Sequence, residues 1–506
     1  KKMKFTVTIA NALYETIQKP YLEPISPAIG AIFAPIYVMA GKVNDALGFG
    51  DETACLFMLL VWLGMPLMLL GRYVPSGFMR TFYTMAIGMF FSAIVFQWQI
   101  LHSIVVALAS YIGILILPRK LSSYFSFIMA FGYLAIVHFW RMEVDYLGWS
   151  LDFSTLQMLT TLKVIAVPFN INDGYKKKKL EKDGIKGRFN PKKDEKGNPQ
   201  NKMFADHYDF ALDRVPNLLE YFGFIFFFPC VLSGPVYEMK DYLIYVYADH
   251  LPSSIVDVLK QVGFGVLNLG LYAVVSPHFP GAEILTPEFV QNCDSYLQLI
   301  YSVWGCAIFL RTKYFIGWYF AQAACVIGGF GYTPESEDKW EAIDQADLVG
   351  VECSVCPRDQ VNNWNKNVAR WLKRYCYTRI SDLTKRRGNM KNMLYTYTIS
   401  AFWHGFYPGY YMMWASYAFV QEVHKNIFRF NRRVKFFSEE EYSGKKWTIK
   451  IIIWNILGFI VSHGALSYFT ASFQLLALDT SIAFFNSVYW IGHIILAVFV
   501  IVSYML

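Results

Sequence analysis

Long apolar runs alternate with short polar segments along most of the chain. A helix that crosses a bilayer needs about 20 mostly apolar residues, and many of these runs approach that length. The run over 82–117 is long enough for two passes, broken near Gln97-Trp98-Gln99. The runs cover residues 25–40, 54–70, 82–117, 124–140, 156–169, 218–232, 255–275, 296–309, 314–327, 394–420, 449–475 and 482–506. The pattern predicts an all-α polytopic membrane protein with about ten or eleven transmembrane helices, several broken or tilted.

Composition supports this fold class. Hydrophobic residues make up 55% of the 506 positions and charged residues 17%, whereas soluble domains carry about 25% charged residues. Such a chain has too little polar surface to cover a water-soluble globule, and intrinsic disorder, collagen and small disulfide scaffolds are excluded. The close pair Cys353 and Cys356 lacks a second such pair, so we expect no metal site. The chain also contains no P-loop and no Gly-x-Ser-x-Gly motif.

Charge is concentrated in three basic stretches. Residues 170–204 contain 11 Lys and Arg, residues 361–391 contain 9 with Asp382 as the one acid, and a third stretch covers 425–450. Because positive loops stay on the cytoplasmic side of a membrane, we expect all three to be cytosolic. Setting the topology is enough to explain the first and third stretches. The second leads directly into the candidate chemistry.

His404 is the strongest candidate among nine histidines. It follows Trp403 inside an apolar run, where an ionisable side chain is costly and is a functional candidate by default. Gly405 permits close approach to the backbone, and Pro408 with Gly409 is expected to kink or end the helix just beyond.

At helical spacing, Tyr397 or Ser400 lies near His404 and would hold one ring nitrogen, which fixes the tautomer. A structural histidine and a catalytic base both fit these facts. His463 is a similar but isolated case, for which we favour a structural role.

A second polar motif lies 39 residues upstream. Trp364 and Trp371 are seven apart, which predicts one shared helix face suited to an interface anchor, and Asn365 between them carries both a donor and an acceptor. Lys373, Arg374 and Arg379 follow. A buried base, an amide and a cationic entrance fit acyl transfer from an anionic carrier to an alcohol. For each cation, contact with lipid headgroups is an equally good explanation.

These motifs resemble the membrane-bound O-acyltransferase (MBOAT) family. The resemblance rests on Trp403-His404-Gly405, preceded by Trp364-Asn365 and Trp371-Leu372 at the family's spacing. The blocks over 215–223 and 233–242 resemble its lysophospholipid acyltransferase branch, and the resemblance extends over 156–419. Two departures are Glu341, where the branch usually has Asp, and Gln322, where relatives often carry Glu.

The resemblance implies an organisation and an activity. Residues 1–155 would be N-terminal membrane helices, 156–425 a catalytic core around a buried tunnel, with cytosolic basic loops near 170–204 and 333–391, and 426–506 C-terminal membrane helices. The substrates would be acyl-CoA and a lysophospholipid, with lysophosphatidylcholine as the expected acceptor. The protein would reside in the endoplasmic reticulum membrane, and a homodimer is compatible with the resemblance. No nucleic acid partner is expected.

The resemblance also implies roles for residues. His404 would take the proton of the glycerol hydroxyl, whose oxygen attacks the thioester directly, and Asn365 would stabilise the oxyanion or orient that hydroxyl. Substrate contacts would come from Trp364, Trp371, Trp403, Gly405, Tyr410, Tyr411, Glu220, Gly234, Pro235 and Tyr237. Lys373, Arg374 and Arg379 would bind the phosphates of CoA. Since the thioester is already activated, no cofactor or metal is expected.

Two alternatives stay open. Another member of this family would acylate diacylglycerol, a sterol or a protein. A polytopic lipid transporter is the non-enzyme alternative, and it would place His404 and Asn365 along a through-pore, often with repeat symmetry. The other large class of lysolipid acyltransferases uses His-x4-Asp, and no histidine here has Asp five positions later.

Overall fold

The computed structural model describes residues 26–47, 52–149, 151–182, 208–279, 281–334, 339–384, 389–442 and 444–505. Within these ranges the chain is helical and contains no strand, which confirms the all-α prediction. Much of the basic stretch over 170–204 lies outside the described residues. The chain forms two compact units, each assembled from separate stretches of sequence.

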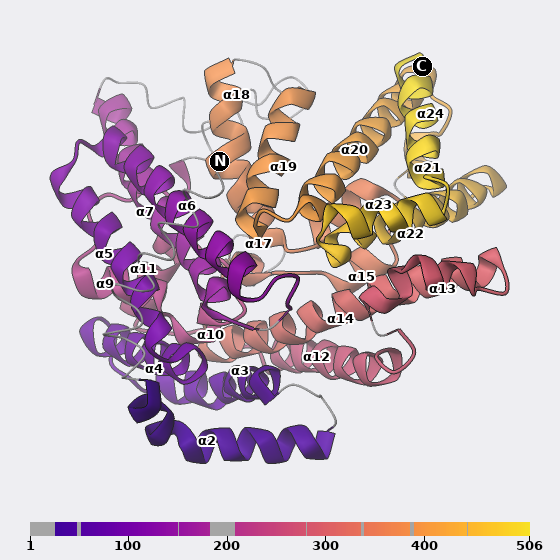
Figure 1. Cartoon of the computed structure of the whole chain (residues 1–506). Helices are drawn as coiled ribbons and strands as arrows, with labels where there is room; N and C mark the ends of the chain where they lie inside the picture. The colour runs from indigo at the N-terminus through magenta and orange to yellow at the C-terminus, as the bar shows by residue number, and fades with distance from the viewer. Residues whose placement is uncertain are drawn as a thin grey trace, which may run out of the picture. The chain divides into compact units, whose positions relative to one another are not determined.

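The first unit comprises Lys1–Gly263, Gly317–Gln345 and Lys373–Thr378. Its long helices α5, α6 and α7 pack side by side (Figure 1). The helices are α2 (Ser26–Leu47), α3 (Glu52–Gly71), α4 (Phe78–Phe96), α5 (Ile100–Ile116), α6 (Arg119–Val144), α7 (Phe153–Lys182), α9 (Leu218–Ile225), α10 (Phe228–Val231) and α11 (Met239–Tyr247). Short turns of 3-10 helix cover Gln97–Gln99 and Glu341–Ile343, and Lys373–Tyr377 is a turn of π-helix.

Backbone contact fixes α4 against the segment that joins α9 and α10. A Cβ built on Gly88 would lie 1.6 Å from the carbonyl oxygen of Phe226, so no other residue fits this contact without moving a backbone. Small residues allow such close helix approach in membrane proteins.

Aromatic rings fill the core beside this contact. Phe227 packs on Phe330 with ring centroids 4.6 Å apart, and Tyr237 packs edge-to-face on Phe330 at 4.9 Å. Tyr242 and Tyr245 each contact the ring of Phe227 at 5.5 Å. All five side chains are buried, and edge-to-face geometry is the arrangement that aromatic quadrupoles favour.

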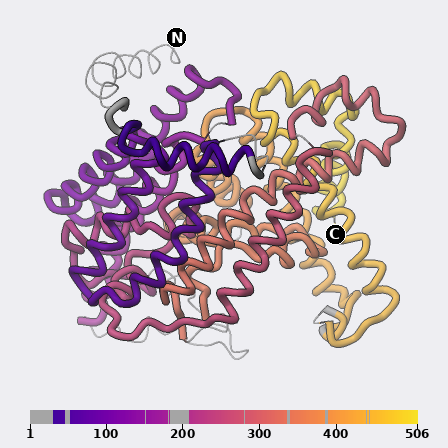
Figure 2. The backbone as a smooth tube through the Cα atoms, turned by 90° about the horizontal axis from the view of Figure 1, so that it is seen from below, coloured from indigo at the N-terminus to yellow at the C-terminus, as the bar shows by residue number. Residues whose placement is uncertain are grey.

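The second unit comprises Phe264–Ile316, Ala346–Leu372 and Arg379–Leu506. In this unit α20 packs against α22, and Figure 2 shows the two helices running out to the turn that carries α21. Its helices are α13 (Pro287–Gln291), α15 (Leu348–Glu352), α16 (Pro357–Asn363), α17 (Lys366–Leu372), α18 (Thr378–Thr384), α19 (Met390–His404), α20 (Pro408–Val434), α21 (Glu439–Tyr442), α22 (Ile449–Leu475), α23 (Leu478–Ser487) and α24 (Ile491–Met505). A 3-10 turn covers Ala282–Leu285, and α12 (Ile255–Val275) and α14 (Tyr296–Gly328) contribute to both units.

Five stretches of helix are long and apolar enough to cross a membrane in the described part of the chain. They are Glu52–Gly71, Phe78–Ile116, Arg119–Val144, Ile255–Val275 and Ile449–Leu475. The pair Leu478–Ser487 and Ile491–Met505, bent by 83°, raises the number to six if it forms one broken span. The predicted number of ten or eleven is therefore not confirmed, although the helical membrane class is.

Three predicted spans differ from the structure, and each has a physical reason. Residues 218–232 form the two short helices α9 and α10, because an apolar run of this length also suits a buried core. Residues 296–309 and 314–327 form the single helix α14, because Arg311 does not end the helix but pairs with Glu352, at 2.6 Å and 2.8 Å.

The break predicted within 82–117 is confirmed. Gln97 has a φ of 51°, outside helical geometry, and a 3-10 turn joins α4 to α5 there. The predicted division of the chain into the segments 1–155, 156–425 and 426–506 is not tested by these two units. It stays a prediction.

Candidate active site

His404 is the last residue of α19, at a sharp break in the chain. Gly405 follows with a φ of 133°, a conformation that L side chains rarely adopt, and its N–H donates back to the carbonyls of Ala401 and Phe402. Pro408 then begins α20, where its missing N–H costs nothing. The expected end of the helix just past His404 is thus confirmed.

Aromatic rings surround the half-buried imidazole of His404. Trp403, Tyr410, Phe473 and Trp414 have ring centroids at 4.8, 5.7, 5.3 and 6.1 Å from it. They come from three helices, α19, α20 and α22. The imidazole of His404 is therefore held in a mainly apolar, aromatic setting.

Two further contacts hold this shell in place. The ring of Tyr397 stacks on Trp414 at 5.7 Å with an interplanar angle of 6°. The N–H of Gly409 donates to the carbonyl of Leu476 at 2.8 Å, and a Cβ on Gly409 would lie 2.0 Å from the Ser472 carbonyl oxygen. The start of α20 is therefore locked against the end of α22. Whether Tyr397 or Ser400 holds an imidazole nitrogen stays a prediction.

Asn365 lies between α16 and α17 with a φ of 44°, in the left-handed region. Asparagine tolerates this conformation better than most residues. Its carbonyl accepts the N–H of Ala369 at 3.0 Å, so the residue starts α17. Its side chain is half-buried.

The predicted shared helix face of Trp364 and Trp371 is wrong. Trp364 follows the end of α16 and Trp371 belongs to α17, because the left-handed Asn365 separates the two helices. Trp364 packs edge-to-face on Tyr314 and Phe315, with centroids at 5.7 and 5.3 Å. Trp371 is 2% exposed and belongs to the core, so it is not an interface anchor.

Arg374 is engaged in an ion pair rather than presented to solvent. Its guanidinium pairs with Glu238 and lies 4.0 Å from the centroid of the Phe210 ring. Lys373 is exposed and Arg379 is half-buried. The role of these three cations in binding CoA stays a prediction.

The other predicted contact residues divide between the two units. Glu220, Gly234, Pro235 and Tyr237 belong to the first, together with Lys373 and Arg374. Trp364, Asn365, Trp371, Trp403, His404, Gly405, Tyr410, Tyr411 and Arg379 belong to the second. The described contacts bring His404, Trp403 and Tyr410 together; which of the others act with them stays a prediction.

Glu220 has a structural role that explains its burial. It forms a capping box with Asn217 at the start of α9, pairs with Arg214 at 2.5 Å and accepts the Tyr247 hydroxyl at 2.6 Å. Burial alone would raise the pKa of this carboxyl. The hydrogen bonds from Arg214, Tyr247 and the Asn217 N–H outweigh burial and hold the pKa below its ordinary value.

A buried polar cluster in the first unit was not predicted from the sequence. Asn170 donates to Glu238 at 2.9 Å, and the Tyr375 hydroxyl lies 2.7 Å from the same carboxylate. The π-helical turn that follows α17 carries Tyr375 and Arg374 to this cluster. The sequence signal for this cluster was the pair of polar residues Asn170 and Asp173, which directly follow an apolar run.

Lys163 is a second buried group that sequence reasoning left unexplained. It is 2% exposed, and its ammonium donates to the carbonyl of Ile225 at 2.9 Å and contacts the Tyr237 hydroxyl at 3.1 Å. Backbone carbonyls at the C-terminal end of α9 thus compensate the charge of this ammonium. Tyr237 is in turn a core residue whose hydroxyl also donates to Phe224.

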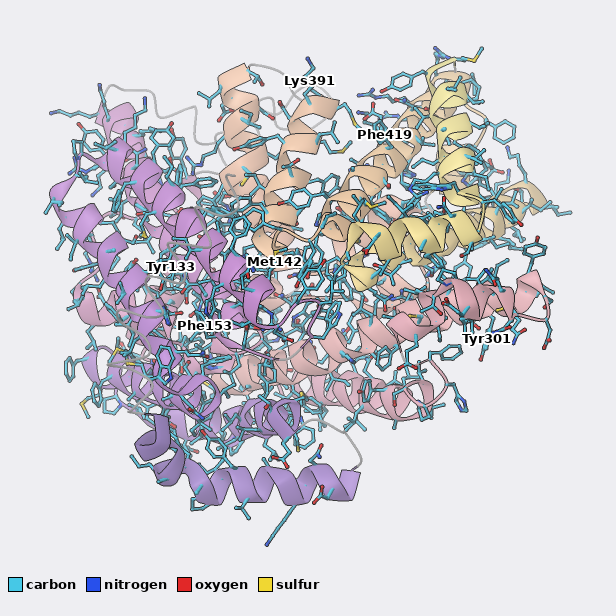
Figure 3. All side chains as sticks on the ribbon, in the orientation of Figure 1. Tyr133, Met142, Phe153, Tyr301, Lys391 and Phe419 are labelled. Atoms are coloured by element: carbon cyan, nitrogen blue, oxygen red, sulfur yellow. The ribbon has the colours of Figure 1, made fainter. Side chains whose placement is uncertain are left out.

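His102 is another half-buried histidine among aromatic rings. Its Nδ1 lies 2.5 Å from the Tyr133 hydroxyl and its ring stacks on Phe153 at 4.7 Å; both partners are labelled in Figure 3. His102 lies in the first turn of α5, directly after the break at Gln97–Gln99, whereas His404 is the last residue of α19 before its break.

Fold and site together define a helical integral membrane protein with a histidine held among aromatic rings at a helix break. The model of the membrane-bound O-acyltransferase (MBOAT) family matches residues 146–470. The chain therefore belongs to the MBOAT family.

Several curated relatives are similar over much of their length. Lysophospholipid acyltransferase 2 of Arabidopsis thaliana is 27% identical over 479 residues, which cover 91% of this chain and 95% of that protein. Human membrane-bound glycerophospholipid O-acyltransferase 2 is 26% identical, covering 83% and 78%. Lysophospholipid acyltransferase of Schizosaccharomyces pombe is 31% identical, covering 58% and 60%.

Proposed function

We propose that this protein transfers an acyl group from acyl-CoA to a lysophospholipid, with lysophosphatidylcholine as the acceptor. The observation that carries the proposal is His404 at the α19 break, within its shell of Trp403, Tyr410, Trp414 and Phe473. Family membership and relatives that bear the name lysophospholipid acyltransferase support it.

The proposed reaction is a direct transfer. His404 takes the proton of the free glycerol hydroxyl while that oxygen forms a bond to the thioester carbon. The C–S bond then breaks, and the CoA thiolate leaves with the proton returned by the imidazolium. A positioned general base contributes about 10²–10⁴-fold to such a step. No metal or prosthetic group takes part in the proposed chemistry.

In this proposal the side chain of Asn365 either stabilises the developing oxyanion or orients the acceptor hydroxyl. Loss of one oxyanion donor costs about 10²–10³ in kcat. The proposal also includes cytosolic basic loops, residence in the endoplasmic reticulum and the larger number of spans around a catalytic tunnel. Lys373, Arg374 and Arg379 are the cations assigned to the phosphates of CoA, and Arg374 also pairs with Glu238.

His404→Ala tests the base. We expect acyl transfer to fall by at least about 10²-fold, the lower end for general-base catalysis, with an unchanged unfolding midpoint. The measurement is product formation by purified protein, read by mass spectrometry over a panel of lysophospholipids and acyl-CoAs. The matched control is His250→Ala, since His250 is exposed. Full activity in a folded His404→Ala variant would exclude His404 as the general base.

Asn365→Gly tests the amide without disturbing the backbone. Glycine adopts a φ of 44° freely, so this variant removes the carboxamide and keeps the turn. We expect kcat to fall about 10²–10³-fold while KM changes little. If KM alone changed, the amide would bind substrate and not the transition state.

The same assay separates the alternatives. Acylation of diacylglycerol, a sterol or a peptide, with none of lysophospholipids, would indicate another acceptor. Lipid movement across a vesicle membrane without product from acyl-CoA would indicate a transporter.

A further inference from the structure

Two side-chain hydrogen bonds join α16 to α20 within the second unit. The hydroxyl of Tyr417 donates to the amide oxygen of Gln360 at 3.0 Å, and the amide nitrogen of Gln421 donates to the carbonyl of Pro357 at 2.8 Å. Tyr417 and Gln360 are 1% and 2% exposed. Because both side chains are buried, water does not readily replace the bond between them.

The order of these bonds sets the relative direction of the two helices. On α20, Tyr417 and Gln421 are about one turn apart. On α16 their partners come in the reverse order, Gln360 for the first bond and Pro357 for the second. The two helices therefore run antiparallel along the surface they share. The end of α16, and Asn365 just beyond it, thus point toward the start of α20.

The start of α20 is also the end that adjoins His404. Pro408 begins α20 shortly after the break at Gly405, which ends α19 at His404. The pairing of α16 with α20 therefore joins the segment that leads to Asn365 to the segment that follows His404. Neither residue has a sequence signal for the other, because 39 positions separate them.

Further contacts make α16 one firm element up to Asn365. The N–H of Trp364 donates to the carbonyl of Gln360 at 3.0 Å, and the N–H of Asp347 donates to the carbonyl of Asn363 at 3.0 Å. The end of α16 is therefore bonded both within the helix and to the start of α15. A shift of Gln360 is passed on to the residues that follow it.

On the other side, α20 has little freedom to move. The bond from the Gly409 N–H to Leu476 and the close packing of Gly409 on Ser472 hold its start against α22. Since α20 is fixed, the hydroxyl of Tyr417 sets the position of α16 rather than the reverse.

We propose that Tyr417 is a positioning residue for acyl transfer. Its hydroxyl holds α16 so that the carboxamide of Asn365 is presented at the His404 break. Tyr417 itself contacts no reacting atom and acts through Asn365. This inference rests on the proposed function. A displacement of about 1 Å in a catalytic group costs up to about 10²-fold in rate, so one hydrogen bond that fixes α16 is enough to matter.

Tyr417→Phe tests this role, because phenylalanine keeps the ring and removes only the hydroxyl. We expect kcat of the purified full chain for acyl transfer to fall about tenfold, less than for a full displacement, while KM for both substrates stays the same. The matched control is Tyr468→Phe on α22, which removes a hydroxyl bonded to His493 at 3.1 Å. It takes no part in the pairing of α16 with α20 and should keep full activity.

A second comparison separates positioning from a general loss of folded protein. The tyrosine change is repeated in Asn365→Gly, which has no carboxamide left to position. If Tyr417 acts through Asn365, kcat of the double variant equals that of Asn365→Gly alone. A smaller folded fraction would instead lower kcat by the same factor in both backgrounds, and that result would overturn the proposal.

The remaining outcomes distinguish this inference from the proposed function. Unchanged kcat in Tyr417→Phe, beside a loss of about 10²–10³-fold in Asn365→Gly, would overturn the role of Tyr417 and leave the proposed function intact. Full activity in Asn365→Gly would contradict the function proposed for the amide and the role of Tyr417 with it. If Tyr417→Phe does not fold, Gln360→Leu decides, because it removes the acceptor of the same hydrogen bond and carries the same expected loss.

Discussion

The half-buried residue Asp241 couples the stability of the first unit to pH. It lies in the short helix α11, where its Oδ2 accepts the N–H of Glu238 at 3.3 Å. Burial, followed by the nearby charge of Glu238, raises the pKa of the Asp241 carboxyl to about 7 from an ordinary 3.8. The folded protein therefore binds this proton more tightly than the unfolded chain does.

The free energy of unfolding should fall as pH rises from about 4 to 7, because deprotonation of Asp241 costs the folded state. We expect Asp241→Asn, which keeps the amide oxygen as an acceptor, to reduce the difference in unfolding midpoint between pH 5 and pH 8. The measurement is thermal unfolding in detergent. Asp213→Asn is the control, since the Asp213 side chain is 80% exposed. An identical pH dependence in Asp241→Asn and the unchanged chain would exclude this carboxyl.

At the scale of elements, pairing decides where helices continue and where they stop. Arg311 is 5% exposed in the middle of α14 and is held by both carboxylate oxygens of Glu352 at the end of α15. The apolar pattern alone suggested a helix boundary at this charge. At Gly405 the opposite happens, because a glycine conformation ends α19 inside an apolar run.

Glu352→Gln should leave the Arg311 charge uncompensated and cost about 3–5 kcal/mol of unfolding free energy, as for other broken buried pairs. The double change Arg311→Met with Glu352→Leu should recover most of this loss, because removal of both charges is often neutral. Denaturant unfolding in detergent measures both. Equal losses in the single and double variants would mean that the side chains act by packing alone.

Sequence patterns predicted one part of this architecture well and another part poorly. The break at Gln97 and the helix end after His404 were predictable, because polar residues interrupt the first apolar run and Gly405, Pro408 and Gly409 interrupt the second. The left-handed Asn365 was not, because spacing assumes continuous helix and so put Trp364 and Trp371 on one face. Contacts between distant segments, such as Glu238 with Arg374, leave no local signal at all.

At the scale of the whole molecule, the proposed topology puts the basic stretches on the cytosolic side of the membrane. Lys391 lies near the start of α19, at the other end of this helix from His404 (Figure 3). Under the proposed topology, the region 333–391 faces the cytosol. Cys353 lies in this region and is exposed, whereas Cys306 is buried.

A membrane-impermeant maleimide added to sealed microsomes should therefore modify Cys353 and leave Cys306 unmodified. Peptide mapping by mass spectrometry gives both results from one sample, with Cys306 as the internal control. Modification of Cys353 only after permeabilisation would place this region in the lumen and reverse the proposed topology.

The contact between Gly88 and the backbone of Phe226 has a consequence for evolution. Lipid-facing positions drift freely as long as they stay apolar, and the Arabidopsis relative shares only 27% of its residues with this chain. The position of Gly88 cannot vary in this way, because its Cα packs directly against the backbone of Phe226 and leaves no room for a side chain. Glycine should therefore persist there across relatives long after the surrounding lipid-facing residues have diverged, and a bulky residue at that position would mark a lineage whose helices pack differently.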